Sequence, residues 1–304
     1  MPLDHAACFD LLCSEDAGGL ADDHGGEDAC WPAALFPDGS DESIAGFIEV
    51  AADYSPVCGY PDRFRSNSLD SSARQEAVAW ILEVHEYYHF RPLTAYLAVN
   101  YMDRFLSAHR LPQNEWALQL LSVACLSLAA KMEETLLPSL LDLQVEGAKL
   151  IFEPRTVLRM ELLVLTALDW RLRSVTPFTF IDFFVHKIDP IGKHARYLIA
   201  WATEITLATI KDIKFLSHCP SSLAAAAIIR ATDEIKDLDS INPVTAASWC
   251  IGLSEEDIAN CYQSLEKDII NSSKPPHMVL SQLKVASSIE MNKGSALHLT
   301  KEGN

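Results

Sequence analysis

The sequence predicts an all-α protein with two consecutive five-helix repeats, an acidic N-terminal segment and a mobile C-terminal tail. Three observations favour this fold class. Apolar residues recur at steps of three and four from Ser71 onward, which is the spacing of amphipathic helices. No stretch competes strongly through the period-two alternation of a half-buried strand. A group of about five helical segments, with a central helix rich in small residues, occurs twice.

The N-terminal segment, residues 1–66, holds fourteen acidic and two basic residues, a large share of the net charge of −18 of the whole chain. Together with its glycine pairs, this composition predicts a mostly disordered segment, because it buries too little apolar surface to offset the entropy of ordering. An acidic chain also repels phosphate groups, so nucleic acid is not an expected partner.

The first repeat is expected over residues 71–172. It begins with a helix whose apolar side chains share one face: Ala77, Trp80, Ile81, Val84, Tyr87 and Tyr88. Pro92 and Pro112 suit the first turns of the next two helices, because proline has no backbone N–H to leave unpaired there. Along Ala117–Ala130, apolar and small residues occur on every side, which predicts a helix buried all round.

The remainder of the first repeat is predicted as two further helices. Pro138 and Pro154 bracket the shorter one. The other is expected over Thr156–Trp170, with an apolar stripe on Leu158, Leu162, Leu165 and Leu168.

The second repeat is expected over residues 176–270. Its predicted helices are Pro177–Val185, Ala195–Ile210, Ser221–Ala231, Pro243–Gly252 and Glu255–Ile270. The small-residue helix Ser221–Ala231 corresponds in position to Ala117–Ala130 in the first repeat. The tail, residues 271–304, begins with Ser-Ser-Lys-Pro-Pro and is expected to be mobile.

Composition and spacing exclude several classes of protein. The eight cysteines never form a C-x-x-C pair and are expected to be reduced thiols of an intracellular protein. His85 and His89 stand at i and i+4, but no third ligand is placed, so surface exposure or packing is favoured over a metal site. No secretory signal is expected, and the longest apolar stretch is shorter than the roughly 20 residues of a membrane span. Neither a cofactor nor a membrane is an expected partner.

Several motifs in the first repeat follow one another in a fixed order. They are Arg74-x5-Trp80, Asn100-Tyr-Met-Asp-Arg-Phe-Leu106, Ala129-Ala-Lys-Met-Glu-Glu-Thr135 and Met160-Glu-Leu-Leu-Val-Leu165 followed by Asp169-Trp170. In this order they resemble the cyclin box, the five-helix repeat of cyclins, strongly over the first repeat and weakly over the second. With an N-terminal Leu-x-Cys-x-Glu, the sequence resembles a D-type cyclin of the plant kind.

The resemblance implies a regulatory subunit that binds and activates a cyclin-dependent kinase, promotes entry into the cell cycle at G1/S and resides in the nucleus, with shuttling to the cytoplasm. Lys131 and Glu161 match the family positions that contact the kinase around its mobile αC helix. Pressure on αC closes the lysine–glutamate ion pair that an isolated kinase leaves open. The alternative for Lys131 is that it favourably ends a buried helix, as a cation at the negative end of the dipole.

A second motif consists of Leu11, Cys13 and Glu15. In an extended strand these side chains project to one side and can enter one groove together. The resemblance implies that they bind the pocket of retinoblastoma-type proteins, which the chain would recruit as substrates. The alternative is a chance match in an acidic segment.

A third site is expected to be degraded. Cyclins of this type dock substrates on an aliphatic slot beside a tryptophan, with an acid and a glutamine nearby. Arg74, Trp80, Glu83 and Gln119 match this pattern, but its Met, Ile and Leu positions are occupied here by Ala73, Glu76 and Ala77. The alternative is that Trp80 is part of the core. Kinase inhibitor proteins are further implied partners.

Two other functions are alternatives to the regulation of a kinase. A transcription-factor-like cyclin-repeat adaptor is disfavoured by the acidic balance. An all-α enzyme is disfavoured because no motif combines an acid, a base and a nucleophile. The steps Ser55-Pro56 and Thr176-Pro177 are candidates for phosphorylation, although Pro177 also suits the start of a helix.

Overall fold

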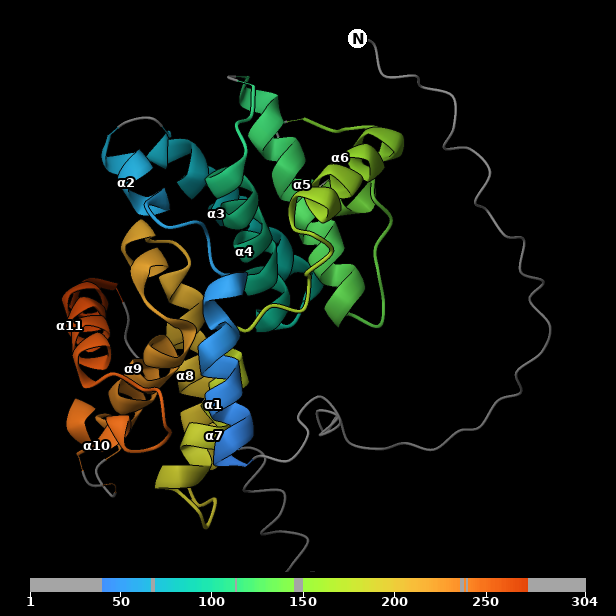
Figure 1. The fold of residues 1–304 in the computed structure, drawn as a ribbon. Helices are drawn as coiled ribbons and strands as arrows, with labels where there is room; N and C mark the ends of the chain where they lie inside the picture. Colours follow the sequence, from blue (N-terminus) through green and yellow to red (C-terminus); the bar gives the residue numbers. More distant parts are fainter. Residues whose placement is uncertain are drawn as a thin grey trace, which may run out of the picture. The chain divides into compact units, whose positions relative to one another are not determined.

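The computed structural model describes residues 40–272, except 67–68, 113, 145–149, 236–237 and 239. This part of the chain contains helices and turns and no strand, which confirms the all-α class (Figure 1). Two separate cores, one for each repeat, account for most of the buried apolar side chains described.

The first half is built around the helix α5. The bounds are α3 Ser71–Tyr88, α4 Pro92–Ala108, α5 Glu115–Glu133 and α6 Pro154–Ala167. Helix α5 packs against the other three, and all residues from 121 to 130 are buried (Figure 1). The prediction of a helix buried all round is therefore confirmed, and it explains why small residues are needed where three neighbours approach.

The second half repeats this arrangement around α9. The bounds are α7 Phe178–Ile188, α8 Ala195–Thr209, α9 Pro220–Thr232, α10 Pro243–Ala247 and α11 Glu255–Ser272. Helix α9 contacts all four of its partners, and every residue from 220 to 229 is buried. Ala224–Ala227 let these neighbours approach closely.

Residues 40–66 of the N-terminal segment, which is expected to be mostly disordered or only locally ordered, contain two short α-helices. Helix α1, Asp41–Val50, begins at the side-chain cap of Ser40, and the short helix α2 covers Tyr60–Arg65. Ile44 and Ala51 are buried in the core of the second half, whereas Tyr60 and Phe64 are buried in that of the first. The apolar residues among the acids are enough for each short helix to pack. Residues 1–39 lie outside the described part.

The apolar stripe expected on α6 is only partly confirmed: Leu168 is buried and Leu165 packs against the first core, but its other two leucines are not buried. Leu158 and Leu162 are 48% and 51% exposed, and the helix buries Val157, Met160 and Val164 instead. Helical spacing shows which residues share a face, but α6 carries two apolar faces. The face with Val157 and Val164 packs against α5. The leucine face is left for solvent or a partner.

Between Pro138 and Pro154 the described residues form the 3-10 turn Asp142–Gln144 and no α-helix. The buried Gln144 side chain accepts a hydrogen bond from Phe152 N–H at 2.7 Å and donates one to Phe152 O at 3.2 Å. These bonds close the loop because the buried amide requires partners. Residues 145–149 and the tail after residue 272 lie outside the described part. No described helix is long and apolar enough to cross a membrane.

Candidate functional site

The two residues assigned to kinase binding lie together on the first half. Lys131 stands in the last turn of α5 and Glu161 in the middle of α6. The Lys131 Nζ donates to both carboxylate oxygens of Glu161, each at 2.7 Å. The Glu161 side chain is 5% exposed and that of Lys131 39% exposed. The Lys131 side chain is therefore partly exposed to solvent, and the largely buried carboxylate of Glu161 holds its ammonium group in place.

The burial of Glu161 explains the geometry of the pair. It lies on the same face of α6 as the buried Met160 and Val164, so its carboxylate is largely withdrawn from water. A buried carboxylate without a cation is costly, and the bidentate ammonium contact offsets that cost. Lys131 also stands at the negative end of the α5 dipole, so its helix-ending role coexists with the ion pair.

Exposed apolar side chains flank this pair in the chain. Six of them, from the end of α5, the following loop and α6, are 38% to 85% exposed: Met132, Leu136, Leu137, Leu158, Leu162 and Leu163. Leu158 and Leu162 are one turn apart and share one side of α6, and exposed apolar side chains that lie together mark interaction surfaces in soluble proteins. We call these six residues, with Lys131 and Glu161, the α5–α6 face. Sequence reasoning missed its leucines because it placed Leu158 and Leu162 in the core.

Glu134 fixes the end of α5 next to this face. Its carboxylate accepts hydrogen bonds from Arg91 N–H, at 2.7 Å, and from Thr94 Oγ1. Both donors belong to the start of α4, whose N-cap makes no side-chain bond of its own. A negative group there is favoured by the helix dipole. Burial raises the pKa of the neighbouring Glu133, with a further contribution from the Glu134 charge.

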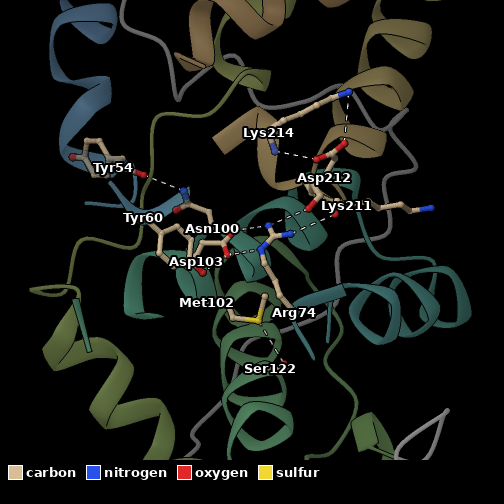
Figure 2. A network of polar contacts seen from close by, with 11 residues as sticks. Tyr54, Tyr60, Arg74, Asn100, Met102, Asp103, Ser122, Lys211, Asp212 and Lys214 are labelled. Carbon is tan, nitrogen blue, oxygen red and sulfur yellow. Dashed lines mark hydrogen bonds and ion pairs between the residues drawn. The ribbon is translucent and has the colours of Figure 1, made fainter. Parts of the chain in front are cut away.

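Arg74, assigned to a substrate-docking patch, is inside the fold (Figure 2). It is 1% exposed and pairs bidentately with Asp103, with Nε–Oδ1 at 2.8 Å and Nη2–Oδ2 at 2.7 Å. Its guanidinium also donates to Ile210 O at 3.1 Å and to Lys211 O, both from the second half. A docked peptide cannot reach this group, so the assignment of Arg74 to peptide contact is corrected to a joint between the halves.

The joint includes Tyr60, whose hydroxyl donates to Asp103 Oδ1 at 2.9 Å (Figure 2). Burial, reinforced by the Asp103 charge, raises the pKa of Tyr60 and keeps it a donor. Burial alone would lower the pKa of Arg74, but the Asp103 carboxylate outweighs this and raises it. The network therefore holds one buried charge of each sign with its hydrogen bonds satisfied.

The other three docking candidates are divided between core and surface. Trp80 is 8% exposed and packs in the first core, as its alternative interpretation predicted. Glu83 is exposed, and the Gln119 amide donates to Leu150 O at 3.1 Å. A role of Glu83 and Gln119 in substrate docking therefore stays a prediction. Leu11, Cys13 and Glu15 lie outside the described residues.

The histidine pair makes no metal site in the described part of the chain. His85 Nε2 is buried with no hydrogen-bond partner, and burial lowers the pKa of this imidazole. His89 ends α3 with a left-handed backbone, at φ 53°. No group of three His, Cys, Asp or Glu side chains among the described residues is arranged to hold a metal ion.

The two halves, each packed around a central helix, match two protein-family descriptions. Residues 44–173 match the family described as "Cyclin, N-terminal domain", and residues 175–294 match "Cyclin, C-terminal domain". The chain belongs to the cyclin family. The ranges meet between α6 and α7, where the structure passes from the first core to the second.

Within the family, the relatives are plant D-type cyclins. The chain is 53% identical to Cyclin-D2-1 of Oryza sativa subsp. japonica, over 90% of this chain and 87% of that protein. It is 51% identical to Cyclin-D1-1 of Arabidopsis thaliana, over 91% of this chain and 82% of that protein. These values confirm the resemblance to D-type cyclins.

Two solved structures share the fold. A viral cyclin from herpesvirus saimiri superposes with a TM-score of 0.58 at 14% identity, covering 67% of this chain and 87% of that one. A chain of the yeast RNA polymerase II CTD kinase complex CTDK-1 superposes with a TM-score of 0.52 at 17% identity, covering 75% of this chain and 72% of that one.

Proposed function

We propose that this chain is the regulatory subunit of a cyclin-dependent serine/threonine kinase and that it binds the kinase through the α5–α6 face. The observation that carries the proposal is the ion pair of Lys131 with the buried Glu161, among leucines that the fold leaves exposed. Membership of the family and the kinase complex named for one structural relative support it.

The two kinds of side chain on this face have different tasks. The leucines supply apolar area, at about 25 cal/mol per Å² removed from water. Glu161 takes two of the three N–H donors of Lys131 and holds the ammonium in place, so that the remaining donor and the positive charge can orient the kinase. A rigid helical surface pressed on the αC helix of the kinase closes its lysine–glutamate ion pair and so activates it.

Substitution on the exposed side of α6 tests this proposal. Leu158→Asp and Leu162→Asp should each weaken binding to a purified cyclin-dependent kinase about tenfold or more, because a charge is buried at the interface. Ile191→Asp is the matched control, since Ile191 is 93% exposed in the second half. Kinase activation and affinity are measured for all three. Equal affinity for all variants would contradict the proposal.

We propose further that Leu11, Cys13 and Glu15 recruit a retinoblastoma-related protein to the bound kinase in the nucleus and so promote the G1/S transition. A tether raises the local concentration of substrate without new contacts at the kinase. Cys13→Gly and Glu15→Lys should lower the rate of phosphorylation of that protein while leaving the rate on an untethered peptide unchanged. A ratio of the two rates that equals the wild-type ratio would contradict the tether.

A further inference from the structure

Ser55 and Thr176 are the two residues of the whole chain that precede a proline as Ser or Thr. The structure separates them. Thr176 is 1% exposed, and its backbone N–H donates to Thr179 Oγ1 at the entry to α7. A kinase cannot reach that hydroxyl in the folded chain.

The surroundings of Ser55 are different. Ser55 follows the 3-10 helix Ala51–Tyr54 with an extended backbone, at φ −103° and ψ 156°. It is partly buried, and five residues near it, Ala52, Asp53, Val57, Cys58 and Gly59, are exposed. Its hydroxyl donates only to Ala51 O, at 3.2 Å, four residues away. A serine with extended backbone and exposed neighbours, whose hydroxyl makes one local bond, is the kind of position that modifying enzymes reach.

Ser55 also occupies the middle of a segment that connects the two cores. On one side Ala51 is buried in the second core, and on the other Tyr60 is buried in the first. Between them, Tyr54 O accepts from Asn100 Nδ2 at 3.0 Å, and Val57 N–H donates to Ser107 Oγ at 3.0 Å. We call residues 51–60 the connecting segment. Ser55 therefore lies between two anchored ends of this segment.

A cation contacts the connecting segment at Asp53. The Arg171 guanidinium stands 3.9 Å from Asp53, two residues before Ser55, and its side chain is 54% exposed. A long, exposed pair of this kind contributes little, so Arg171 is free to exchange its partner. Ser55 also lines a small hollow that is open to solvent.

We propose that Ser55 is a phosphorylation site and that Arg171 binds the phosphate, which tightens the connecting segment on the two halves. The donor is Mg-ATP, and the enzyme is a proline-directed serine/threonine kinase. The Ser55 oxygen forms a bond to the γ-phosphorus, the bond to the β-phosphate oxygen breaks, ADP leaves, and the hydroxyl proton passes to the base of the kinase. The phosphate brings about −1.5 to −2 charges, which a guanidinium pairs with through two hydrogen bonds.

The first experiment locates the phosphate. A proline-directed kinase is chosen that phosphorylates both synthetic peptides 49–61 and 170–182, and it is then given the full chain with Mg-ATP. Mass spectrometry should find close to one phosphate per chain, on Ser55, and none on Thr176. Ser55→Ala should remove it and Thr176→Val should not. An unmodified Ser55 in the full chain, or equal modification of Thr176, would overturn the proposal.

The second experiment tests the bound form. Amide hydrogen exchange of the connecting segment should be at least severalfold slower in the phosphorylated chain than in the unmodified one. Arg171→Gln should abolish the difference, whereas the control Arg65→Gln should keep it, because Arg65 is also exposed to solvent and pairs with Asp62. Exchange that is unchanged by phosphorylation, or equally slowed in Arg171→Gln, would refute the role of Arg171.

Discussion

Lys131 and Glu161 are hydrogen-bonding partners at the edge of the first core. Substitution of either residue therefore leaves the other without its ion-pair partner. Removal of Lys131 leaves a largely buried carboxylate without its two hydrogen bonds. Removal of Glu161 leaves an ammonium that is more than a third exposed and can be hydrated. The two halves of the pair therefore contribute differently to stability.

This asymmetry makes a prediction. Lys131→Ala should lower the free energy of unfolding by about 1 to 3 kcal/mol, the usual cost of an unpaired buried polar group. Glu161→Gln, which keeps an acceptor, should cost less. Urea unfolding of both single variants and the double variant measures this. A double variant whose cost equals the sum of the two single costs would show that the pair is not coupled.

The buried position of Glu133, next to this site, predicts how the stability of the fold depends on pH. Its pKa is raised in the folded chain by burial. The folded state therefore holds the proton more tightly, and stability is lost as pH rises through the folded pKa. Glu133→Gln removes this loss, so its stability relative to wild type should be greater at pH 7 than at pH 4. Urea unfolding at both values checks the sign, and an advantage larger at pH 4 would contradict it.

At the scale of the element, α6 has two apolar faces, and the tertiary packing buries only one. The buried face carries Val157, Met160 and Val164, whereas Leu158 and Leu162 remain half exposed. An exposed leucine side chain costs little when removed, because it has few packing partners to lose. A buried valine leaves a cavity.

The two faces should therefore respond in opposite ways. Val164→Ala should lower the free energy of unfolding by about 1 to 3 kcal/mol and leave kinase affinity per folded molecule unchanged. Leu162→Ala should change stability by less than about 0.5 kcal/mol and weaken kinase binding. Thermal unfolding and affinity, measured on the same preparations, test the pair. A larger loss of stability for Leu162→Ala would show that the leucine face is packed.

At the scale of the whole molecule, the Arg74–Asp103 pair joins two halves that have separate cores. Arg74 belongs to α3 and Asp103 to α4, and the carbonyls of Ile210 and Lys211 come from the second half (Figure 2). Breaking a buried ion pair on one side is expensive because the remaining charge stays in the core.

Arg74→Ala should therefore destabilise the protein by about 3 to 5 kcal/mol and turn one unfolding transition into two, as each half unfolds separately. Arg65→Ala, which breaks an exposed pair with Asp62, is the control and should change stability by less than about 1 kcal/mol. Calorimetry distinguishes the outcomes. A single transition at the wild-type temperature in Arg74→Ala would exclude the joint.

The all-α class, the two repeats and the two central helices α5 and α9 could be predicted from the amino-acid sequence. This was possible because a helix with apolar and small residues on every side has only one stable place, surrounded by others. The resemblance to cyclins implies that Lys131 and Glu161 bind the kinase; the structure places them in contact, and their role in binding stays a prediction. The identity of the partners and the tether at Leu11, Cys13 and Glu15 stay predictions.

Three features could be known only from the tertiary structure. These are the face of α6 that is buried, the burial of the Arg74 side chain, and the packing of residues 40–66 against the two cores. Each of these depends on a partner that is distant in the chain: α5 for α6, Asp103 and Ile210 O for Arg74, and the two cores for Ile44 and Tyr60. Local periodicity and charge describe what a segment can bury. The face that a segment does bury depends on which other elements pack against it in the folded protein.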